Sequence, residues 1–486
     1  MNKDIRNLAP KSLWNHFSNL NAVPRPSKKE EKVIQFMVDF GAKLNLETIV
    51  DKVGNVIIKK SATKGLEDRK TVVLQSHLDM VHQKNNNTNF DFDTQGIEML
   101  IENDCVTAKG TTLGADNGLG VASIMAILSS KEIEHPNLEA LFTIDEETGM
   151  TGAMGLDSTI LKGDILLNLD TEEDDEIGMG CAGGIDVTAT KSFKEEKTPE
   201  NVIGYQITVN GLQGGHSGMD IHKGLGNANK IMNRLLFDGL NKFGLRISQI
   251  NGGSLRNAIP RESIAKIVIE DIFKEAFIVE INESIELIKN ELLLVEPNLN
   301  IEISEISISE KVMELGAQES CIKSIYASVN GVYKMSLAIP DLVETSNNIA
   351  KITVKNGKIE VLCLTRSSSE SSKKDLSNSL QSCFELGGFE VTFSGNYPGW
   401  QPNINSEILT VVTDLYEKLH GEKPKVAACH AGLECGILGE HYPKMDMVSF
   451  GPTIRGAHSP DEKVSISSVQ KFWKFLIEIL KNIPKK

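Results

Sequence analysis

Apolar positions in the first part of the chain alternate between helical spacing and short continuous runs. Residues 32–44 carry apolar side chains at helical spacing, which predicts a helix with one buried face. Compact apolar runs at 71–75, 138–144 and 165–169 are typical of buried strands. Between the first two runs, residues 118–129 are small and apolar, which predicts a buried helix. Strands that alternate with helices predict a mostly parallel sheet with helices on its faces.

The pattern changes between about residues 186 and 395. Here we expect amphipathic helices at 227–240 and 274–294, and a polar, serine-rich loop at 367–372. Strand-like runs flank the helices, at 203–209, 263–269, 299–303, 349–354, 358–364 and 389–394. The order suggests an α+β region of two successive αβ units.

The last part of the chain returns to α/β character, with a helix expected at 408–419, a strand at 445–450 and a long helix at 466–483. This return predicts one α/β domain, with a mostly parallel sheet flanked by helices, that is interrupted by an inserted domain. The predicted boundaries are 1–185 and 396–486 for the two segments of the α/β domain, and 186–395 for the insertion.

The composition excludes some classes of binding partner. The 486 residues include 51 Lys and Arg against 66 Asp and Glu, for a formal net charge of -15. Nucleic acid and anionic membranes both require a basic face, so neither is expected as a partner. The 7 cysteines are scattered without a C-x-x-C pair, and no apolar leader is evident. We therefore expect reduced thiols and a cytoplasmic location.

Acidic and imidazole side chains follow the predicted strands directly. They are His77 and Asp79, Glu146 and Glu147, Asp170 and His458, with Asp116 at the entry of the small-residue helix. Loops at the carboxyl ends of parallel strands meet at one crevice. So many carboxylates in one place require cations, because like charges repel. Imidazoles with carboxylates suit zinc, cobalt or manganese, and a water between two such ions becomes hydroxide near neutral pH.

Each of these residues also has an ordinary structural interpretation. His77 and Asp79 could form a simple imidazole–carboxylate pair, and Asp116 could cap the following helix. Glu146 and Glu147 could form a solvated turn, and Asp170 and His458 could be loop residues. Only their joint occurrence after successive apolar runs favours a metal site.

The ordered motifs resemble a known family. They are H-L-D-M, G-T-T-L-G-A-D-N-G, D-E-E-T-G, L-N-L-D-T-E, G-G-H-S-G, H-A-G-L-E-C-G and A-H-S-P, and they span nearly the whole chain. The set is similar to that of the co-catalytic zinc exopeptidases, in particular their aminoacyl-histidine (Xaa-His) dipeptidase branch. The resemblance implies a zinc exopeptidase-like catalytic domain whose insertion acts as a lid.

The resemblance also implies roles for the strand-end residues. His77 and Asp170 would hold one metal ion, Glu147 and His458 the other, and Asp116 would bridge the two, with a cis peptide to Asn117. Asp79 would orient His77, and Glu146 would be the general base. Two divalent ions per chain are therefore expected, zinc first, with cobalt or manganese as alternatives.

For the substrate, the resemblance implies residues outside the metal set. His216 would donate to the tetrahedral oxyanion, Asn257 would lie near the substrate, and Arg366 would bind the free carboxylate. Glu434 is a candidate partner of the terminal amine, with His430 as a pocket wall. Arg366 also has an ordinary interpretation, as a surface arginine beside a serine run.

The predicted function is a cytosolic, metal-dependent dipeptidase that acts on unblocked dipeptides, Xaa-His dipeptides included, through a metal-bridging hydroxide with Glu146 as general base. Two enzymatic alternatives share the metal constellation: an aminoacylase or deacetylase, and a tripeptide aminopeptidase. A catalytically silent binding protein of the same fold is the third alternative. The expected partner is the dipeptide substrate, and a homodimer remains open because smaller relatives donate lid residues across a dimer.

Overall fold

The computed structural model describes residues 3–85 and 87–486 and divides into two compact units. The first unit combines Met1–Gly180, Trp400–Ala428 and Leu433–Lys486. The second combines Cys181–Gly399 with the short return Cys429–Gly432.

The first unit is built on an eight-stranded sheet with the strand order β1-β2-β6-β3-β7-β23-β8-β22. In that order the strands are Glu47–Val50, Val56–Lys60, Leu138–Thr143, Val72–His77, Ile165–Asn168, Asp446–Ser449, Glu176–Cys181 and Lys425–Cys429. A small four-stranded sheet accompanies it, with β24 (Ile454–Arg455), β25 (Lys463–Ser465), β5 (Cys105–Ala108) and β4 (Met99–Glu102).

The centre of the larger sheet is parallel and buried. Strand β3 pairs in parallel with β6 and β7, and β7 pairs in parallel with β23. All residues of β3 and β6 are buried, as expected for strands covered on both faces. The predicted runs at 71–75, 138–144, 165–169 and 445–450 are confirmed as these four strands, and their carboxyl ends lie at the same edge.

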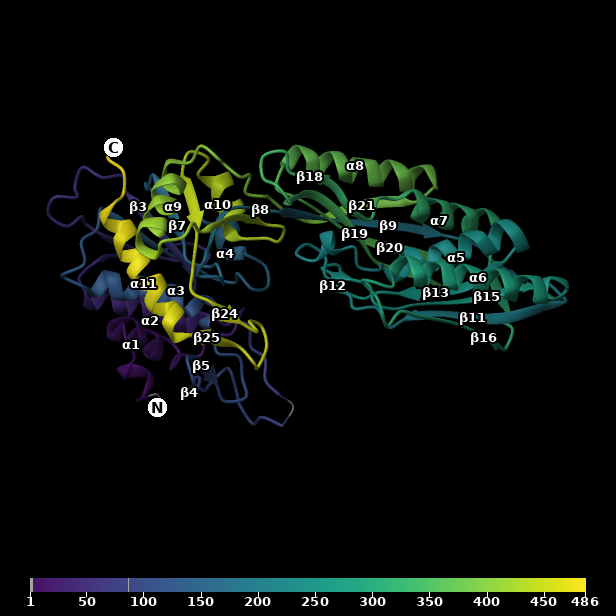
Figure 1. Cartoon of the computed structure of the whole chain (residues 1–486), viewed down its shortest axis with the longest axis horizontal. Coiled ribbons are helices and arrows are strands. Elements are labelled where there is room, and N and C mark those ends of the chain that lie inside the picture. The colour runs from purple at the N-terminus through teal and green to yellow at the C-terminus, as the bar shows by residue number, and fades with distance from the viewer. Residues whose placement is uncertain (1–2, 86) are drawn as a thin grey trace. The chain divides into compact units, whose positions relative to one another are not determined.

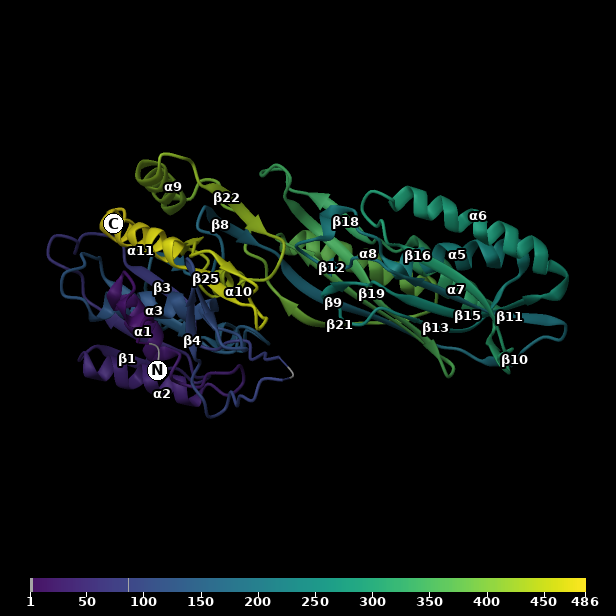
Figure 2. The same ribbon diagram turned by 60° about the horizontal axis from the view of Figure 1, so that its bottom comes forward.

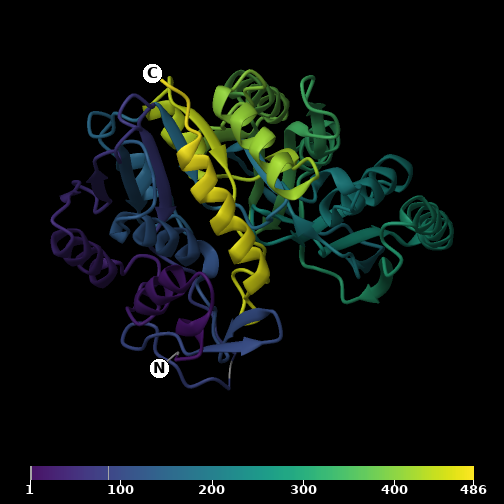
Figure 3. The same ribbon diagram turned by 60° about the vertical axis from the view of Figure 1, so that its left-hand side comes forward.

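Helices cover this sheet. They are α1 (Lys11–Leu20), α2 (Glu31–Lys43), α3 (Ala115–Ser129), α4 (Thr151–Gly155), α9 (Glu407–His420), α10 (Glu434–His441) and α11 (Ile466–Lys481). Helix α3 is buried almost all round because its residues are small and apolar. Figure 3 shows α11, in yellow, in front of the strands of this unit. Within the described residues, no helix has both the length and the apolar content needed to cross a membrane.

The second unit contains an antiparallel nine-stranded sheet with the order β16-β11-β15-β13-β19-β20-β9-β21, and with β18 paired to β19 (Figure 2). In that order the strands are Asn300–Ile306, Val202–Asn210, Ser263–Glu270, Arg246–Gly252, Val343–Lys355, Lys358–Ser367, Gly183–Ser192 and Glu390–Tyr397, and β18 is Gly331–Met335. Two short pairs join β10 (Glu195–Lys197) to β17 (Lys311–Met313), and β12 (Gly215–His216) to β14 (Ala258–Ile259).

The helices of the second unit pack on one face of its sheet (Figure 1). They are α5 (Ala228–Phe243), α6 (Lys274–Leu292), α7 (Leu315–Ala327) and α8 (Glu370–Leu386). Alternate strand residues such as Tyr205, Ile207 and Val209 share one apolar cluster with all of these helices. That alternation places the core on a single side of the sheet.

One expectation for this unit was wrong. The serine-rich segment 367–372 is not a solvated loop, because Ser367 ends β20 and α8 begins at Glu370. The Ser369 side chain accepts a hydrogen bond from the backbone nitrogen of Ser372, and it therefore acts as the N-cap of α8. Serine favours both loops and helix starts, so composition alone did not separate the two.

Candidate metal and catalytic site

The functional side chains of the first unit lie where the parallel strands end. His77 is the last residue of β3, Asp170 follows β7 by two residues, and Glu146 and Glu147 follow the end of β6. His458 lies further along the chain from β23, in the loop between β24 and β25, and Asp116 lies in the first turn of α3. The fold therefore gathers these residues from segments that are far apart in the sequence.

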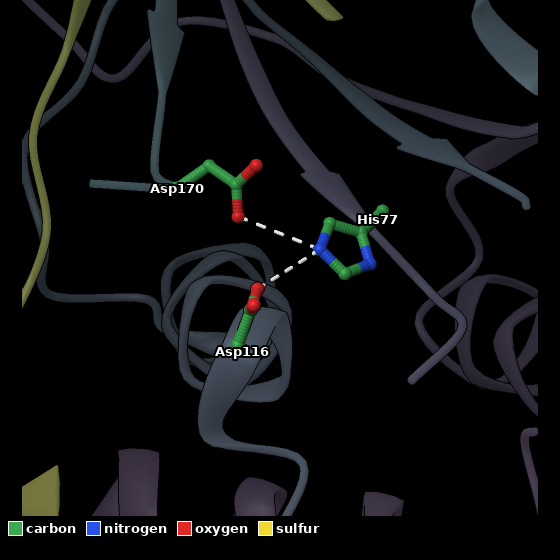
Figure 4. A group of neighbouring side chains, drawn as sticks. All are labelled: His77, Asp116 and Asp170. Atoms are coloured by element: carbon green, nitrogen blue, oxygen red, sulfur yellow. Dashed lines mark hydrogen bonds and ion pairs between the residues drawn. The ribbon is translucent and has the colours of Figure 1, made fainter. Parts of the chain in front are cut away.

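Asp116 lies between the two imidazoles. Its Oδ1 is 3.1 Å from Nε2 of His77 (Figure 4), and its Oδ2 is 3.3 Å from Nε2 of His458. Each carboxylate oxygen thus faces a different ring. This is the arrangement that a bridging ligand needs, and it is not that of a helix cap.

The remaining ligand candidates flank this arrangement on both sides. Asp170 Oδ1 is 3.5 Å from Nε2 of His77, and Glu147 Oε2 is 2.9 Å from Nε2 of His458. Three groups have ligand atoms that lie within 4.8 Å of one another: His77, Asp116 and Asp170; His77, Glu146 and Glu147; and Asp116, Glu147 and His458.

The backbone at Asp116 has an unusual form. The peptide bond between Asp116 and Asn117 is cis, as the resemblance implied, and both residues have non-helical dihedral angles at the start of α3. Asn117 Nδ2 donates to the backbone oxygen of Leu169 at 2.6 Å and to the Asp170 carboxylate. The residue after the bridging candidate therefore also fixes Asp170.

The acidic pair after β6 is not a solvated turn. Asp145 has a positive φ of 56°, and its carboxylate accepts from the hydroxyl of Thr148 and pairs with Lys28. Asp79 accepts from the backbone nitrogens of Glu146, at 3.0 Å, and Glu147, at 3.3 Å. These contacts hold the turn in a conformation that is uncommon for residues other than glycine.

Burial and neighbouring charges shift the pKa values of several residues in this group. Burial and the negative charges of Asp170, Glu434 and Glu147 raise the pKa of Glu146 well above its usual range. Burial and the nearby carboxylates raise the pKa of Asp170 to about 6. Burial opposes ionisation of Asp116 too, but the two imidazoles outweigh it and lower its pKa. Hydrogen bonds from His458 to Asp116 and Glu147 raise the pKa of that imidazole to about 11.

The donor set fits divalent cations. Two imidazole nitrogens and several carboxylate oxygens converge, and Glu147 Oε1 is buried without a hydrogen-bond partner among the described residues. Nitrogen and oxygen donors in this mixture suit zinc and related ions. Positive charge at this place would relieve the mutual repulsion of the carboxylates.

Glu434 lies in the same unit, at the start of α10, and is fully buried. Its Oε2 accepts from Nε2 of Gln75 and Oγ1 of Thr143, both at 2.6 Å. Its Oε1 has no hydrogen-bond partner in the part of the chain that the structure describes. Burial raises the pKa of this carboxyl to about 8.

The second unit gathers its own polar cluster around Arg366. This residue belongs to β20 and is only 4% exposed, so it is not a surface arginine. Its Nη1 donates to the hydroxyl of Tyr397 at 2.8 Å, and its Nη2 lies 3.5 Å from Nε2 of His216. Asn257 lies beside His216, because β12 pairs with β14 and the Asn257 backbone oxygen accepts from Ser217 at 2.8 Å.

His216 is held as a neutral ring. Its Nδ1 accepts from the backbone nitrogens of Gly218, at 3.2 Å, and Met219, at 3.0 Å. Burial and the charge of Arg366 lower the pKa of His216 to about 4. A neutral imidazole whose Nδ1 accepts must carry its proton on Nε2, so that atom is a donor.

His430 belongs to the same cluster. It is 6% exposed, and its Nε2 lies 2.7 Å from the Ser346 hydroxyl. Burial, with the positive charge of Arg366, lowers its pKa to about 3.

Sequence reasoning gave no role to several residues near these clusters, Tyr397 and Glu172 among them. Tyr397 contacts Arg366 from a strand 31 positions further along the chain, and no local pattern indicated it. Glu172 was given no role, but burial and the charges of Asp116 and Asp170 raise its pKa to about 8. Its position two residues after Asp170 was the one feature of the sequence that could have indicated that it lies near the ligand candidates.

Comparisons with known proteins identify the family of the chain. A model of peptidase family M20/M25/M40 matches residues 73–482. The cytosol non-specific dipeptidase of Escherichia coli (strain K12) is 43% identical over 487 residues, which cover 99% of this chain and 100% of that protein. The crystal structure of aminoacylhistidine dipeptidase from Vibrio alginolyticus has a TM-score of 0.93 and 47% identity, with 99% of this chain and 98% of that chain covered. An aminopeptidase from Bacillus cereus, with a TM-score of 0.58, 16% identity and 98% and 99% coverage, shares the fold. The chain belongs to peptidase family M20/M25/M40.

Proposed function

We propose that this protein is a metal-dependent dipeptidase of the cytoplasm that hydrolyses unblocked dipeptides, Xaa-His dipeptides included. The names of the two similar proteins, a cytosol non-specific dipeptidase and an aminoacylhistidine dipeptidase, support this substrate class. The observation that carries the proposal is the position of Asp116, with one oxygen toward each imidazole, beside the turn that holds Glu146 and Glu147.

The same geometry supports the proposed metal ligands. His77 and Asp170 would hold one divalent ion, Glu147 and His458 the other, and Asp116 both. Zinc is the first choice for these donors, with cobalt or manganese as alternatives. When bound, such ions lower the pKa of water and polarise a peptide carbonyl.

Glu146 is the general base in this proposal. It removes a proton from the attacking water and later delivers it to the leaving amine, so that one carboxylate serves both halves of the reaction. Asp79 keeps this side chain in place through the Glu146 backbone nitrogen, and keeps His77 in place through its Nδ1, which lies 3.4 Å from Asp79 Oδ1.

Residues of the second unit would recognise the rest of the substrate. His216 would donate its Nε2 proton to the oxyanion, which a neutral ring with an accepting Nδ1 can do. Arg366 would bind the free carboxylate of the dipeptide, because a buried guanidinium fork matches that group. Asn257, beside His216, would lie near the substrate.

Recognition of both substrate ends would limit the substrate to two residues. We assign the terminal amine to Oε1 of Glu434, a buried oxygen that has no protein partner among the described residues. A tripeptide carries its carboxylate one residue further from its amine, and an acetylated amino acid has no ammonium group for Glu434.

The experiment is a substrate panel on chelator-treated protein that is reloaded with zinc, cobalt or manganese. It compares Xaa-His and other dipeptides with tripeptides and N-acetyl amino acids. Dipeptides are expected to be hydrolysed about 10- to 100-fold faster than the other two classes, because each of those classes loses one hydrogen-bonded contact to a charged group. Preferential turnover of tripeptides or acetylated amino acids would replace the proposal by one of those activities. Binding of dipeptide without turnover under every metal would identify a silent binding protein.

A further inference from the structure

The short loop 113–116 leads into the first turn of α3 and ends at Asp116, and two buried side chains of opposite charge contact it from opposite sides. Glu462 is 2% exposed and Arg25 is 1% exposed. Neither belongs to the ligand set, and they come from opposite ends of the chain.

Glu462 holds the amide side of this loop. Its Oε2 accepts from the backbone nitrogens of Leu113, at 2.7 Å, and Gly114, at 2.9 Å. Its Oε1 accepts from those of Ala115, at 2.7 Å, and Asp116, at 3.3 Å. Leu113 and Gly114 directly precede α3, and Ala115 and Asp116 are its first two residues, whose N–H groups have no acceptor within the helix. One carboxylate therefore satisfies four donors in succession.

Arg25 holds the carbonyl side. Its Nη2 donates to the backbone oxygen of Gly114 at 2.6 Å. Its Nη1 donates to the backbone oxygens of Leu78, at 3.0 Å, and Asp79, at 2.9 Å. A single guanidinium thus joins the segment after His77 to the segment before Asp116.

The loop is shaped for this contact. Gly114 has a φ of 70°, and a Cβ atom at this position would lie 2.5 Å from Nη2 of Arg25. Asn21 adds support, because its Nδ2 donates to the Leu113 oxygen at 3.0 Å and its Oδ1 accepts from Arg25 at 3.2 Å.

Burying an isolated carboxylate and an isolated guanidinium is costly, and the cost falls only when hydrogen bonds and opposite charge compensate both. Here the compensation comes from backbone groups of the ligand-bearing segments. Glu462 also follows His458 by only four residues, so it joins the His458 loop to the Asp116 loop. Through Arg25 and Glu462, the segments that carry His77, Asp116 and His458 are fixed to one another.

We propose that Arg25 and Glu462 are positioning residues that set the place of Asp116 between the two imidazoles, and hence the affinity of the site for its metal pair. The proposal rests on the proposed function only in that the site is taken to bind metal. Neither residue touches the reacting atoms. Their effect is expected on metal affinity and kcat, with KM largely unchanged.

The test uses the full chain and the variants Glu462→Gln and Arg25→Lys. A glutamine offers one acceptor oxygen in place of two, and a lysine ammonium does not span both segments. Zinc affinity is measured by competition with a chelator, the cobalt-loaded protein gives an absorption spectrum, and kcat and KM are measured on a dipeptide. Each variant is expected to lose about 10- to 100-fold in zinc affinity and to change the cobalt spectrum.

Glu139→Gln is the matched control. Glu139 is also a buried carboxylate of the first unit, and it accepts from the backbone nitrogens of Lys162, at 2.7 Å, and Gly163, at 2.9 Å. It lies at the start of β6, while the ligands lie beyond strand ends. This variant is expected to lower the melting temperature of the metal-free protein while leaving zinc affinity at the wild-type value.

Wild-type zinc affinity and an unchanged cobalt spectrum in both Glu462→Gln and Arg25→Lys would overturn the proposal, even if their melting temperatures fall as in the control. If Glu462→Gln does not fold, Arg25→Lys and the charge-retaining Glu462→Asp decide by the same readouts. A wild-type protein that binds no zinc or hydrolyses no dipeptide would instead contradict the proposed function. The two failures are therefore distinguishable.

Discussion

Asp79 Oδ1 lies 3.0 Å from the backbone nitrogen of Glu146, and it is the same oxygen that lies 3.4 Å from Nδ1 of His77. One carboxylate therefore contacts both an imidazole of the ligand set and the turn that carries the proposed base. Ser27 fixes that carboxylate in turn, because its hydroxyl donates to Asp79 Oδ2 at 2.8 Å. The position of the base thus depends on the position of the first imidazole.

Replacing Asp79 by asparagine should weaken both contacts, because the amide is neutral and presents only one acceptor oxygen. We expect zinc affinity and kcat each to fall by about 10- to 100-fold, as for other residues that orient metal ligands. Chelator competition and steady-state kinetics measure the two effects. Asp39→Asn, at an exposed position of α2, is the control, and equal behaviour of the two variants would refute the role of Asp79.

Glu146→Gln should keep metal but lose turnover. The amide has nearly the shape of the carboxylate, but it cannot take a proton from water, so we expect kcat to fall by roughly 100- to 10,000-fold. Metal content by elemental analysis should remain that of the wild type. The control is Glu132→Gln, at an exposed position outside the site. Normal dipeptide turnover by the Glu146 variant would show that another group is the base.

Arg366 can be tested with a modified substrate as well as a variant. If its guanidinium binds the free carboxylate, a dipeptide amide should be about 10- to 100-fold poorer than the free dipeptide in kcat/KM, since hydrogen bonds to charged groups are worth a few kcal/mol. Arg366→Met should lose a similar factor on the free dipeptide and no further factor on the amide. Arg234→Met, which removes a partly exposed arginine of α5 that pairs with Glu291 of α6 in the same unit, should keep the wild-type discrimination. Full discrimination by the Arg366 variant would exclude this role.

His430 makes stability depend on pH. Its pKa is about 3 in the fold, against 6.5 for an unperturbed histidine, so the unfolded chain binds the proton more readily. The stabilisation is therefore fully present above about pH 6.5 and is lost as the pH falls toward about 3. When the pH falls from 7 to 5, this one group should lower the free energy of unfolding by about 2 kcal/mol.

Urea unfolding of the wild type and of His430→Gln at pH 7 and pH 5 measures this dependence. The variant should show a smaller loss of stability between the two pH values, whatever its stability at pH 7. His82→Gln, at an exposed position of the first unit, should retain the wild-type dependence. An identical pH dependence in all three proteins would contradict a neutral, buried His430.

Much of the first unit could be predicted from local pattern. The apolar runs that became β3, β6, β7 and β23 are continuous because both faces of these strands are buried. The rule that carboxyl ends of parallel strands share an edge then predicts that His77, Asp170 and His458 lie close together. In the second unit, helix α7 and strands β9 and β13 were not predicted. Their residues alternate less clearly, and their burial comes from packing against neighbours in an antiparallel sheet.

The sequence by itself determined which residue types lie at the strand ends. Their joint occurrence there was enough to predict a metal centre. Only the tertiary structure decided that each oxygen of Asp116 faces a different imidazole, and that Arg366 is buried beside Tyr397. It alone brought Arg25 and Glu462 to opposite sides of one loop. The physical reason is that a sequence pattern carries information about one element at a time. Periodicity reports which face of an element is buried, whereas contacts between residues of different elements depend on how those elements pack.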